Sequence, residues 1–338
     1  NRSGAKTHME NIGRDSNHEF GFNPCAEILL RDKQFCNLTE IIINSNDKVQ
    51  DLRRKVEMAA ILGTCQSGLT NFPYLGADWR SNCEEERLLG VSMTGIYDNP
   101  LTWGKEGLGK LAHRLERLRA HAHKTNMDWA EKIGINPSKA ITCVKPSGTV
   151  SCLCDTSSGI HPRYAEHFIR RVRIDKKDPL YALMKKQGVA EEDCVMNPDA
   201  TGVFAFPMKA PKGSLTSQDL NAISHLELWR VYKRHWTDHN PSITVSYTDE
   251  EFLDVGRWIW ENFADVQGIS FLPKTEHIYK QAPFEGISAK EYAVLAAECP
   301  EVDFESLIKY EKIDSTQGSQ TLACTGGSCE IVDLVEQQ

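Results

Sequence analysis

The sequence predicts an α/β fold in which parallel strands alternate with helices. Short β-branched or apolar stretches, such as residues 38–43 and 140–144, stand between longer stretches with helical character, such as 107–132. This alternation is typical of an α/β barrel or of an open sheet with parallel strands. The residues by themselves leave both architectures open.

The elements follow in order along the chain. Residues 1–22 are polar, without a sustained apolar period, and are predicted to be a loop. The predicted strands cover 38–43, 88–93, 140–144, 242–246 and 268–272. The predicted helices cover 51–68, 107–132, 220–234 and 249–263. Residues 175–219 are predicted to mix helical pieces with loops, and the pattern fades after about residue 305.

Composition narrows the function classes. The 40% hydrophobic and 25% charged residues are typical of a soluble globular protein, and the net charge of -8 argues against broad nucleic-acid binding. No apolar run approaches the roughly 20 residues that span a membrane, and no export signal is recognisable. We therefore expect a cytoplasmic protein whose eleven cysteines are mostly reduced. The first residue, Asn1, leaves open a processed product, a fragment or one part of a split protein.

The most informative segment is Asn23-Pro24-Cys25-Ala26-Glu27, which is followed by Cys36. In an extended segment Asn23, Cys25 and Glu27 point to the same face, where they offer an amide, a thiol and a potential general base to one small target. The alternative is a buried structural cysteine. The flanking polar groups argue against it, because burying them without a task is costly.

A second candidate site follows the predicted strand 140–144. It comprises Pro146, Ser147, Gly148, Thr149, Val150 and Ser151. Its small residues, hydroxyls and backbone N–H groups suit an anion nest, particularly if a helix begins there. It lacks the Walker arrangement, and by itself an ordinary turn is an equal interpretation.

The remaining cysteines divide into two groups. Cys324 and Cys329 are separated by four residues, two of them glycine, so they are predicted to be an exchanging dithiol rather than a zinc half-site. Cys143, Cys152 and Cys154 lie near a histidine but lack the paired spacing of a zinc knuckle. We interpret them as structural and predict no metal site.

These segments together resemble the catalytic subunit of ribonucleotide reductase. The resemblance rests on Asn23 to Glu27, on Cys36-Asn37-Leu38, on residues 146–151 with 157–162, and on the pair Cys324 and Cys329. It implies the second half of a ten-stranded α/β barrel, with a central finger loop near residues 20–40. It also implies that residues 1–305 belong to the barrel half and that 306–338 form a flexible redox tail.

The resemblance assigns roles in making deoxyribonucleotides for DNA synthesis. Cys25 would carry the thiyl radical that removes the 3′ hydrogen of the ribose. Glu27 would take the proton of the 3′ hydroxyl, and Asn23 would hydrogen-bond the sugar oxygens. Cys36 would be one of two thiols that deliver electrons while the 2′ hydroxyl leaves as water.

The other two motifs would serve binding and turnover. Residues 146–151 would hold the substrate phosphates. Cys324 and Cys329 would re-reduce the active-site disulfide and would then be reduced by thioredoxin.

The motifs are more similar to the adenosylcobalamin-dependent, triphosphate-reducing branch than to the others. The metal-dependent, diphosphate-reducing enzymes carry two adjacent tyrosines near the C-terminus, and this chain has no such pair. The glycyl-radical motif is also missing. The family's second active-site thiol comes from the first half of the barrel, so we expect the chain to need a complementary N-terminal polypeptide. The rival interpretations are a thiol–disulfide redox module without nucleotide chemistry and a zinc-binding structural protein.

Overall fold

Five parallel backbone segments lie next to one another in the first of two units. The computed structural model describes residues 2–274 and 280–311. The first unit comprises Asn1–Arg163, Pro211–Leu215 and Asp219–Lys274, and the second comprises Tyr164–Ala210, Thr216–Gln218 and Thr275–Gln338.

Two pairs of strands in the first unit are joined by a central segment. Strand β3 (Asn37–Ile42) runs parallel to β4 (Leu89–Thr94), and β8 (Thr244–Tyr247) runs parallel to β9 (Ser270–Pro273). Residues 140–144 lie between the pairs, because Thr142 bridges to β4 and Val144 bridges to Pro241, each in parallel. The predicted parallel α/β arrangement is therefore confirmed for this unit, although 140–144 forms bridges rather than a full strand.

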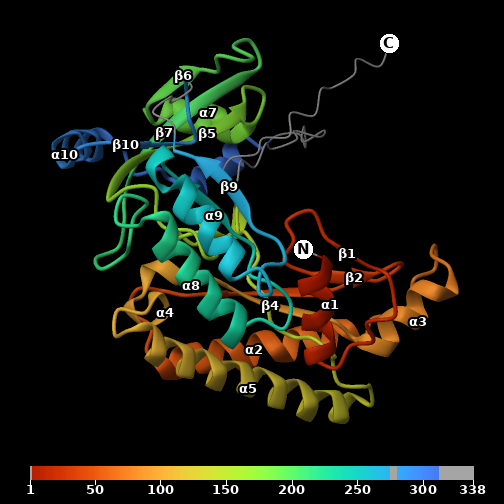
Figure 1. Cartoon of the computed structure of the whole chain (residues 1–338). Helices are drawn as coiled ribbons and strands as arrows, with labels where there is room; N and C mark the ends of the chain where they lie inside the picture. The colour runs from red at the N-terminus through yellow and green to blue at the C-terminus, as the bar shows by residue number, and fades with distance from the viewer. Residues whose placement is uncertain (1, 275–279, 312–338) are drawn as a thin grey trace. The chain divides into compact units, whose positions relative to one another are not determined.

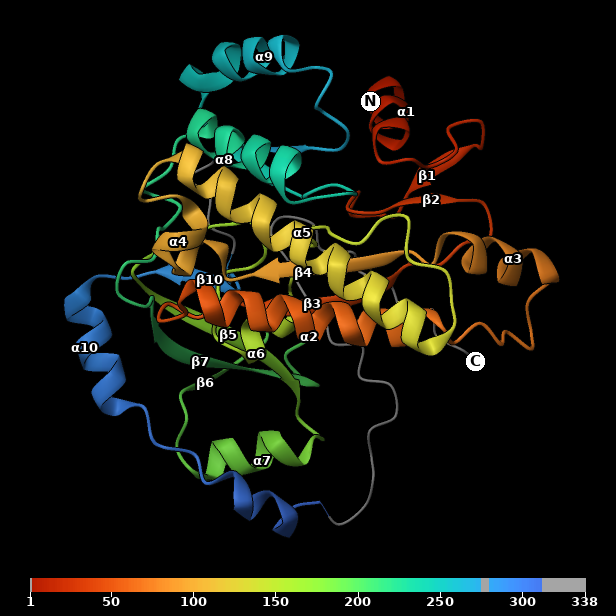
Figure 2. The same cartoon turned by 90° about the horizontal axis from the view of Figure 1, so that it is seen from below.

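The helices that follow α1 in this unit are α2 (Val49–Ser67), α3 (Ala77–Glu86), α4 (Pro100–Trp103), α5 (Leu108–Ile133), α6 (Thr149–Leu153), α8 (Ala222–His235) and α9 (Phe252–Glu261). Helix α2 packs against β3 and β4, and α8 packs against β8. Helices α2 and α5 lie side by side (Figures 1 and 2). Every residue of β4 is buried, as expected for a parallel strand that is covered on both faces. The core includes Leu52, Val56, Leu115, Trp229 and Trp236.

The N-terminal residues are not the predicted loop. They contain helix α1 (Arg2–Asn11) and the short strand β1 (Phe20–Phe22), which pairs antiparallel with β2 (Leu29–Arg31). Ala5 and Met9, four residues apart on α1, pack against Leu29. A helix this short is marginal in isolation, so tertiary packing rather than a strong local pattern stabilises it.

The second unit contains an antiparallel sheet in the order β10-β5-β7-β6. Its strands are β5 (His167–Asp175), β6 (Glu191–Asp193), β7 (Thr201–Lys209) and β10 (Phe284–Gly286). Its helices are α7 (Pro179–Lys186), α10 (Ala289–Glu298) and the 3₁₀ turn η3 (Phe304–Lys309).

The prediction of helical pieces and loops for 175–219 is therefore wrong in part, because β6 and β7 fall in that range. Gly202 and Pro207 weaken the strand signal of β7. Gly202 is needed, since a Cβ there would lie 2.3 Å from the ring of Tyr181. The predicted tail begins inside η3, and residues 312–338 lie outside the described residues.

Among residues 2–274 and 280–311, no helix combines the length and the hydrophobicity that crossing a membrane requires.

Three histidines with lowered pKa values, of which His225 and His239 are buried, make the first unit sensitive to acid. Burial, with a contribution from Lys233, lowers the pKa of His8 to about 3. Burial also lowers the pKa of His239 to about 3 and that of His225 to about 4. From about pH 6.5 downward the unfolded chain therefore binds protons that the native state excludes, so the free energy of unfolding falls as the pH decreases.

We expect urea unfolding at pH 5 to report a free energy of unfolding that is lower than at pH 7.5 by about 2 kcal/mol for each of these three histidines. His225→Gln should reduce this difference, because glutamine does not titrate. The exposed His113→Gln should leave it unchanged. Equal unfolding free energies at the two pH values would contradict the expectation.

Candidate active site

The Cys25 segment forms the tip of the β1–β2 hairpin. Strand pairing ends at Phe22 and Leu29, and residues 23–28 make the connection (Figure 1). The Asn23 N–H donates to the Ile28 carbonyl at 3.2 Å, and the Ile28 N–H donates to Asn23 Oδ1 at 2.9 Å. Ala26 has a left-handed backbone with φ of 59°. Residues 23–27 are therefore not extended, because the hairpin turns the chain back on itself, and the shared face that an extended segment would give to Asn23, Cys25 and Glu27 does not arise.

The turn separates the environments of the thiol and the carboxylate. Cys25 is exposed, whereas Glu27 is only 4% exposed. The Glu27 Oε2 atom is buried without a hydrogen-bond partner among the described residues. A buried carboxylate oxygen without a partner is costly, and such atoms are found where a ligand or a reacting group completes the site.

The Glu27 carboxylate influences three thiols. Burial and the Glu27 charge raise the pKa of Cys25, while Lys145 opposes them. Burial raises the pKa of Cys36, and Glu27 adds to that effect. The pKa of Cys143 is raised by burial and then by Cys36 and Glu27. One carboxylate acts on all three, so Cys25, Cys36 and Cys143 lie in one region, and each thiol keeps its hydrogen at neutral pH.

Cys143 is a member of this region that the sequence prediction treated as structural. Its Sγ atom lies 3.2 Å from the place where a Cβ on Gly90 would be, and Ile28 and Leu38 side chains approach the same point. The missing side chain of Gly90 therefore lets β3, residues 140–144 and the hairpin tip converge. In the sequence, the one feature that pointed to a role for Cys143 in the site was its position directly before the 146–151 loop.

The loop from Pro146 to Ser151 leads into α6, as an anion nest requires. Ser147 and Ser151 are buried and bond within the loop: the Ser151 N–H donates to Ser147 Oγ at 3.1 Å, and the Ser151 hydroxyl donates to the Ser147 carbonyl. The Ser147 N–H donates to Ser158 Oγ at 3.0 Å. The serines thus shape the loop rather than present their hydroxyls.

The backbone of the same loop has unused donors. Within the described part of the chain, the N–H groups of Gly148, Thr149 and Val150 have no hydrogen-bond partner. Free amides at the start of a helical turn attract anions. His161 connects this loop to β8, since it bonds the Ser158 carbonyl through Nδ1 and accepts from the Thr244 N–H at 2.9 Å through Nε2.

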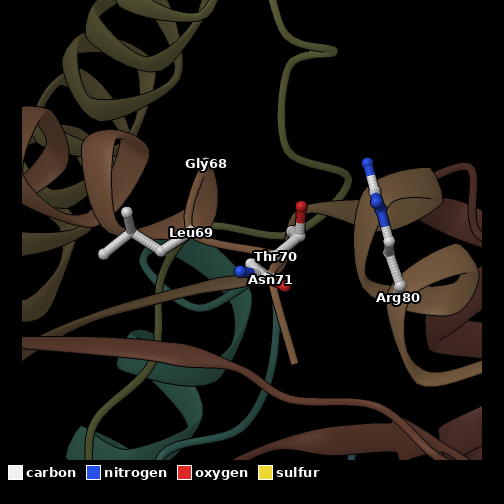
Figure 3. A pocket seen from close by; sticks show the side chains of 5 residues that line it. All are labelled: Gly68, Leu69, Thr70, Asn71 and Arg80. Carbon is white, nitrogen blue, oxygen red and sulfur yellow. The ribbon is translucent and has the colours of Figure 1, made fainter. Parts of the chain in front are cut away.

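Cys324 and Cys329 lie outside the described residues. A cavity of about 360 Å³ is lined by Gly68, Leu69, Thr70, Asn71 and Arg80, and includes no predicted site residue. Figure 3 shows Arg80 on α3 across from Thr70 and Asn71. Residues 2–274 and 280–311 contain no group of three or more His, Cys, Asp or Glu side chains that could hold a metal ion.

The fold of the chain is similar to that of solved ribonucleotide reductases. It matches the crystal structure of a B12-dependent, class II ribonucleotide reductase with a TM-score of 0.74 and 25% identity, over 86% of this chain and 43% of that one. The class Id ribonucleotide reductase alpha subunit of Actinobacillus ureae shares the fold with a TM-score of 0.54 and 12% identity, over 80% of this chain and 57% of that one. No family model matches.

The proteins most similar in sequence among those compared belong to one branch of this class. Adenosylcobalamin-dependent ribonucleoside-triphosphate reductases are 28% identical in Euglena gracilis, over 80% of this chain and 37% of the relative. Those of Levilactobacillus brevis and Lactobacillus leichmannii are 27% and 28% identical, each over 92% of this chain and 45% of the relative. The chain spans less than half the length of these relatives. The resemblance to ribonucleotide reductase, and to its adenosylcobalamin-dependent branch, is confirmed.

Proposed function

We propose that this chain is the C-terminal catalytic part of an adenosylcobalamin-dependent ribonucleotide reductase that reduces ribonucleoside triphosphates to 2′-deoxyribonucleotides. The observation that carries the proposal is the hairpin tip, where an exposed thiol, Cys25, precedes the buried Glu27 carboxylate in the region of Cys36. The names of the relatives support the substrate class and the cofactor.

The chemistry of the ribose needs the groups at the tip. Cys25, as a thiyl radical, takes the 3′ hydrogen atom, and Glu27 takes the proton of the 3′ hydroxyl. Asn23 already uses its side-chain oxygen on Ile28, which leaves its NH₂ group to donate to the sugar oxygens. The unpaired Oε2 atom of Glu27 supports the general-base role, because a proton acceptor must be open to its donor.

Two thiols provide the two electrons of the reduction. They become a disulfide while the 2′ hydroxyl leaves as water, so one turnover consumes one dithiol. Cys36 is one of them in this proposal. Its raised pKa keeps it as a protonated thiol, which can deliver a hydrogen together with an electron. Cys324 and Cys329 then exchange with the disulfide and are themselves reduced by thioredoxin.

The loop 146–151 binds the substrate phosphates in this proposal. The free N–H groups of Gly148, Thr149 and Val150 support that role, because backbone amides at a helix start suit phosphate oxygens. Lys145, whose Nζ lies 3.9 Å from Glu40, precedes the loop and adds positive charge.

The Cys25 thiol fits a cofactor that abstracts hydrogen. It is exposed, and its raised pKa favours the S–H form that hydrogen-atom transfer requires. Adenosylcobalamin, when bound, supplies the radical chemistry that removes this hydrogen. The chain's own part is to hold the thiol at the tip of a short hairpin.

A complementary N-terminal polypeptide completes the enzyme in this proposal. The chain spans 37–45% of its relatives, and five adjacent parallel segments are the number that half of a ten-stranded barrel would have. The partner half brings the second electron-donating thiol, and the complete enzyme works in the cytoplasm.

The test is anaerobic CTP reduction with adenosylcobalamin and dithiothreitol, using this chain alone and then with a matching N-terminal half. We expect deoxycytidine triphosphate only in the mixture. Absence of product from a mixture whose halves associate would refute the proposal.

The tail pair has its own test. Cys324→Ser should retain CTP reduction with dithiothreitol, because a small thiol can reach the active-site disulfide directly. It should lose at least tenfold in rate with thioredoxin, since the exchange partner is missing. Cys299→Ser, at the end of α10, is the control and should behave as wild type with both reductants. Equal loss with both reductants would remove the shuttle role.

A further inference from the structure

We propose that Asn240 and Gly268 form a clamp that positions the hairpin tip carrying Cys25 and Glu27. Asn240 is fully buried. Its backbone N–H donates to the Glu27 carbonyl at 3.0 Å, and its Nδ2 donates to the Ala26 carbonyl at 2.9 Å. One residue thus holds two successive carbonyls of the tip.

Gly268 is the second member of the clamp and contacts both Asn240 and Ala26. Its carbonyl accepts from Asn240 Nδ2 at 3.1 Å. A Cβ at residue 268 would lie 2.6 Å from the Cβ of Ala26, so only glycine permits this approach. Ala26 is in the left-handed region, a conformation that persists where the surrounding structure over-determines it. The contacts of the clamp fix Ala26 in this conformation.

The clamp is itself anchored to the strands. Residues 237–240 are each at most 1% exposed. His239 Nε2 bonds the Leu89 carbonyl of β4 at 2.9 Å, and the Asp238 carboxylate accepts from the Ile141 N–H at 2.9 Å. Asp238 also pairs with Arg119 at 2.7 Å. His239 Nδ1 and Asn240 Oδ1 are buried without a hydrogen-bond partner among the described residues, but the bonds to Leu89 and Ile141 tie residues 238–240 to the strands, so the position of the strands sets the position of the tip.

The inferred function of the clamp is to set the position of the reacting groups at the tip. Cys25 and Glu27 flank Ala26, so a shift of Ala26 moves the thiol relative to the carboxylate. A displacement of about 1 Å can cost roughly 10²-fold in rate. Asn240 and Gly268 are therefore positioning residues rather than catalytic ones, and this kinetic consequence rests on the proposed function.

The first experiment does not need activity. Hydrogen–deuterium exchange of residues 23–28 and the alkylation rate of Cys25 by iodoacetamide are measured by mass spectrometry on the full chain, with the exposed Cys65 and Cys152 as internal references. Asn240→Ala and Gly268→Ala should each raise tip exchange and alter Cys25 alkylation at least threefold, while the reference cysteines stay unchanged.

Matched controls separate the clamp from general destabilisation. Asn99 is also buried and bonds backbone carbonyls, but at residues 44 and 47, so Asn99→Ala should leave tip exchange unchanged. Gly256→Ala meets no atom within 4 Å and is the control for Gly268→Ala. The double variant Ala26→Gly with Gly268→Ala removes the colliding Cβ and should restore the wild-type tip.

Kinetics of the reconstituted enzyme are the second readout. Gly268→Ala keeps every donor in place and should lower kcat 10- to 100-fold with KM within twofold, and the double variant should recover most of that loss. Unchanged tip exchange and alkylation in both single variants would overturn the clamp. If the variants alter tip exchange but the reconstituted wild-type enzyme does not reduce CTP, the clamp is upheld. The proposed function is then refuted.

Discussion

Cys25→Ser should reduce ribonucleotide reduction to background, a loss of at least 10⁴-fold in this proposal, with nucleotide binding unchanged. The hydroxyl of serine holds its hydrogen too strongly to become the radical that attacks the 3′ position. The substitution is nearly isosteric at an exposed site, so the fold should be preserved. The measurement is CTP reduction in the reconstituted enzyme, together with CTP binding by equilibrium dialysis.

Cys65→Ser is the control for Cys25→Ser, because it removes another exposed thiol, on α2. It should retain wild-type turnover. Turnover above background in Cys25→Ser would eliminate the thiyl assignment, whereas loss of CTP binding would indicate damage to the site rather than to the chemistry.

Glu27→Gln should slow the chemical step by roughly 10²–10⁴-fold, because glutamine cannot accept the proton of the 3′ hydroxyl. Glutamine fills the same buried volume, and it keeps the backbone carbonyl that accepts from Asn240. The loss should therefore fall on the rate constant of the chemical step, measured in single turnovers, with little change in CTP affinity.

Glu57→Gln is the matched control, since that carboxylate lies on α2 and, within residues 2–274 and 280–311, bonds to His121. It should turn over as wild type. A Glu27→Gln enzyme with an unchanged single-turnover rate would take Glu27 out of the mechanism.

Local sequence patterns were sufficient to predict most of the strands and helices of the first unit. β3, β4, β8 and β9 lie within two residues of the predicted strands, because short apolar runs bounded by helical periodicity carry a strong signal. The long helix α5 was also predicted to within one residue at each end. The hairpin, α1 and the sheet of β5 and β7 were not, since each depends on a partner distant in sequence.

The candidate site was likewise predictable only in part from the sequence. The types and spacing of Asn23, Cys25, Glu27 and Cys36 are visible in the sequence because chemistry restricts which side chains can serve. Their geometry is not, since the segment is a hairpin tip rather than an extended strand.

The sequence by itself therefore determined the α/β class, the principal strands and helices of the first unit, and the candidate reacting groups. Only the tertiary structure decided that Glu27 is buried, that Cys143 belongs with Cys36, and that Asn240 and Gly268 hold the tip. The physical reason is that burial, charge interaction and close backbone approach arise between residues more than a hundred positions apart. No local pattern in the chain encodes such contacts.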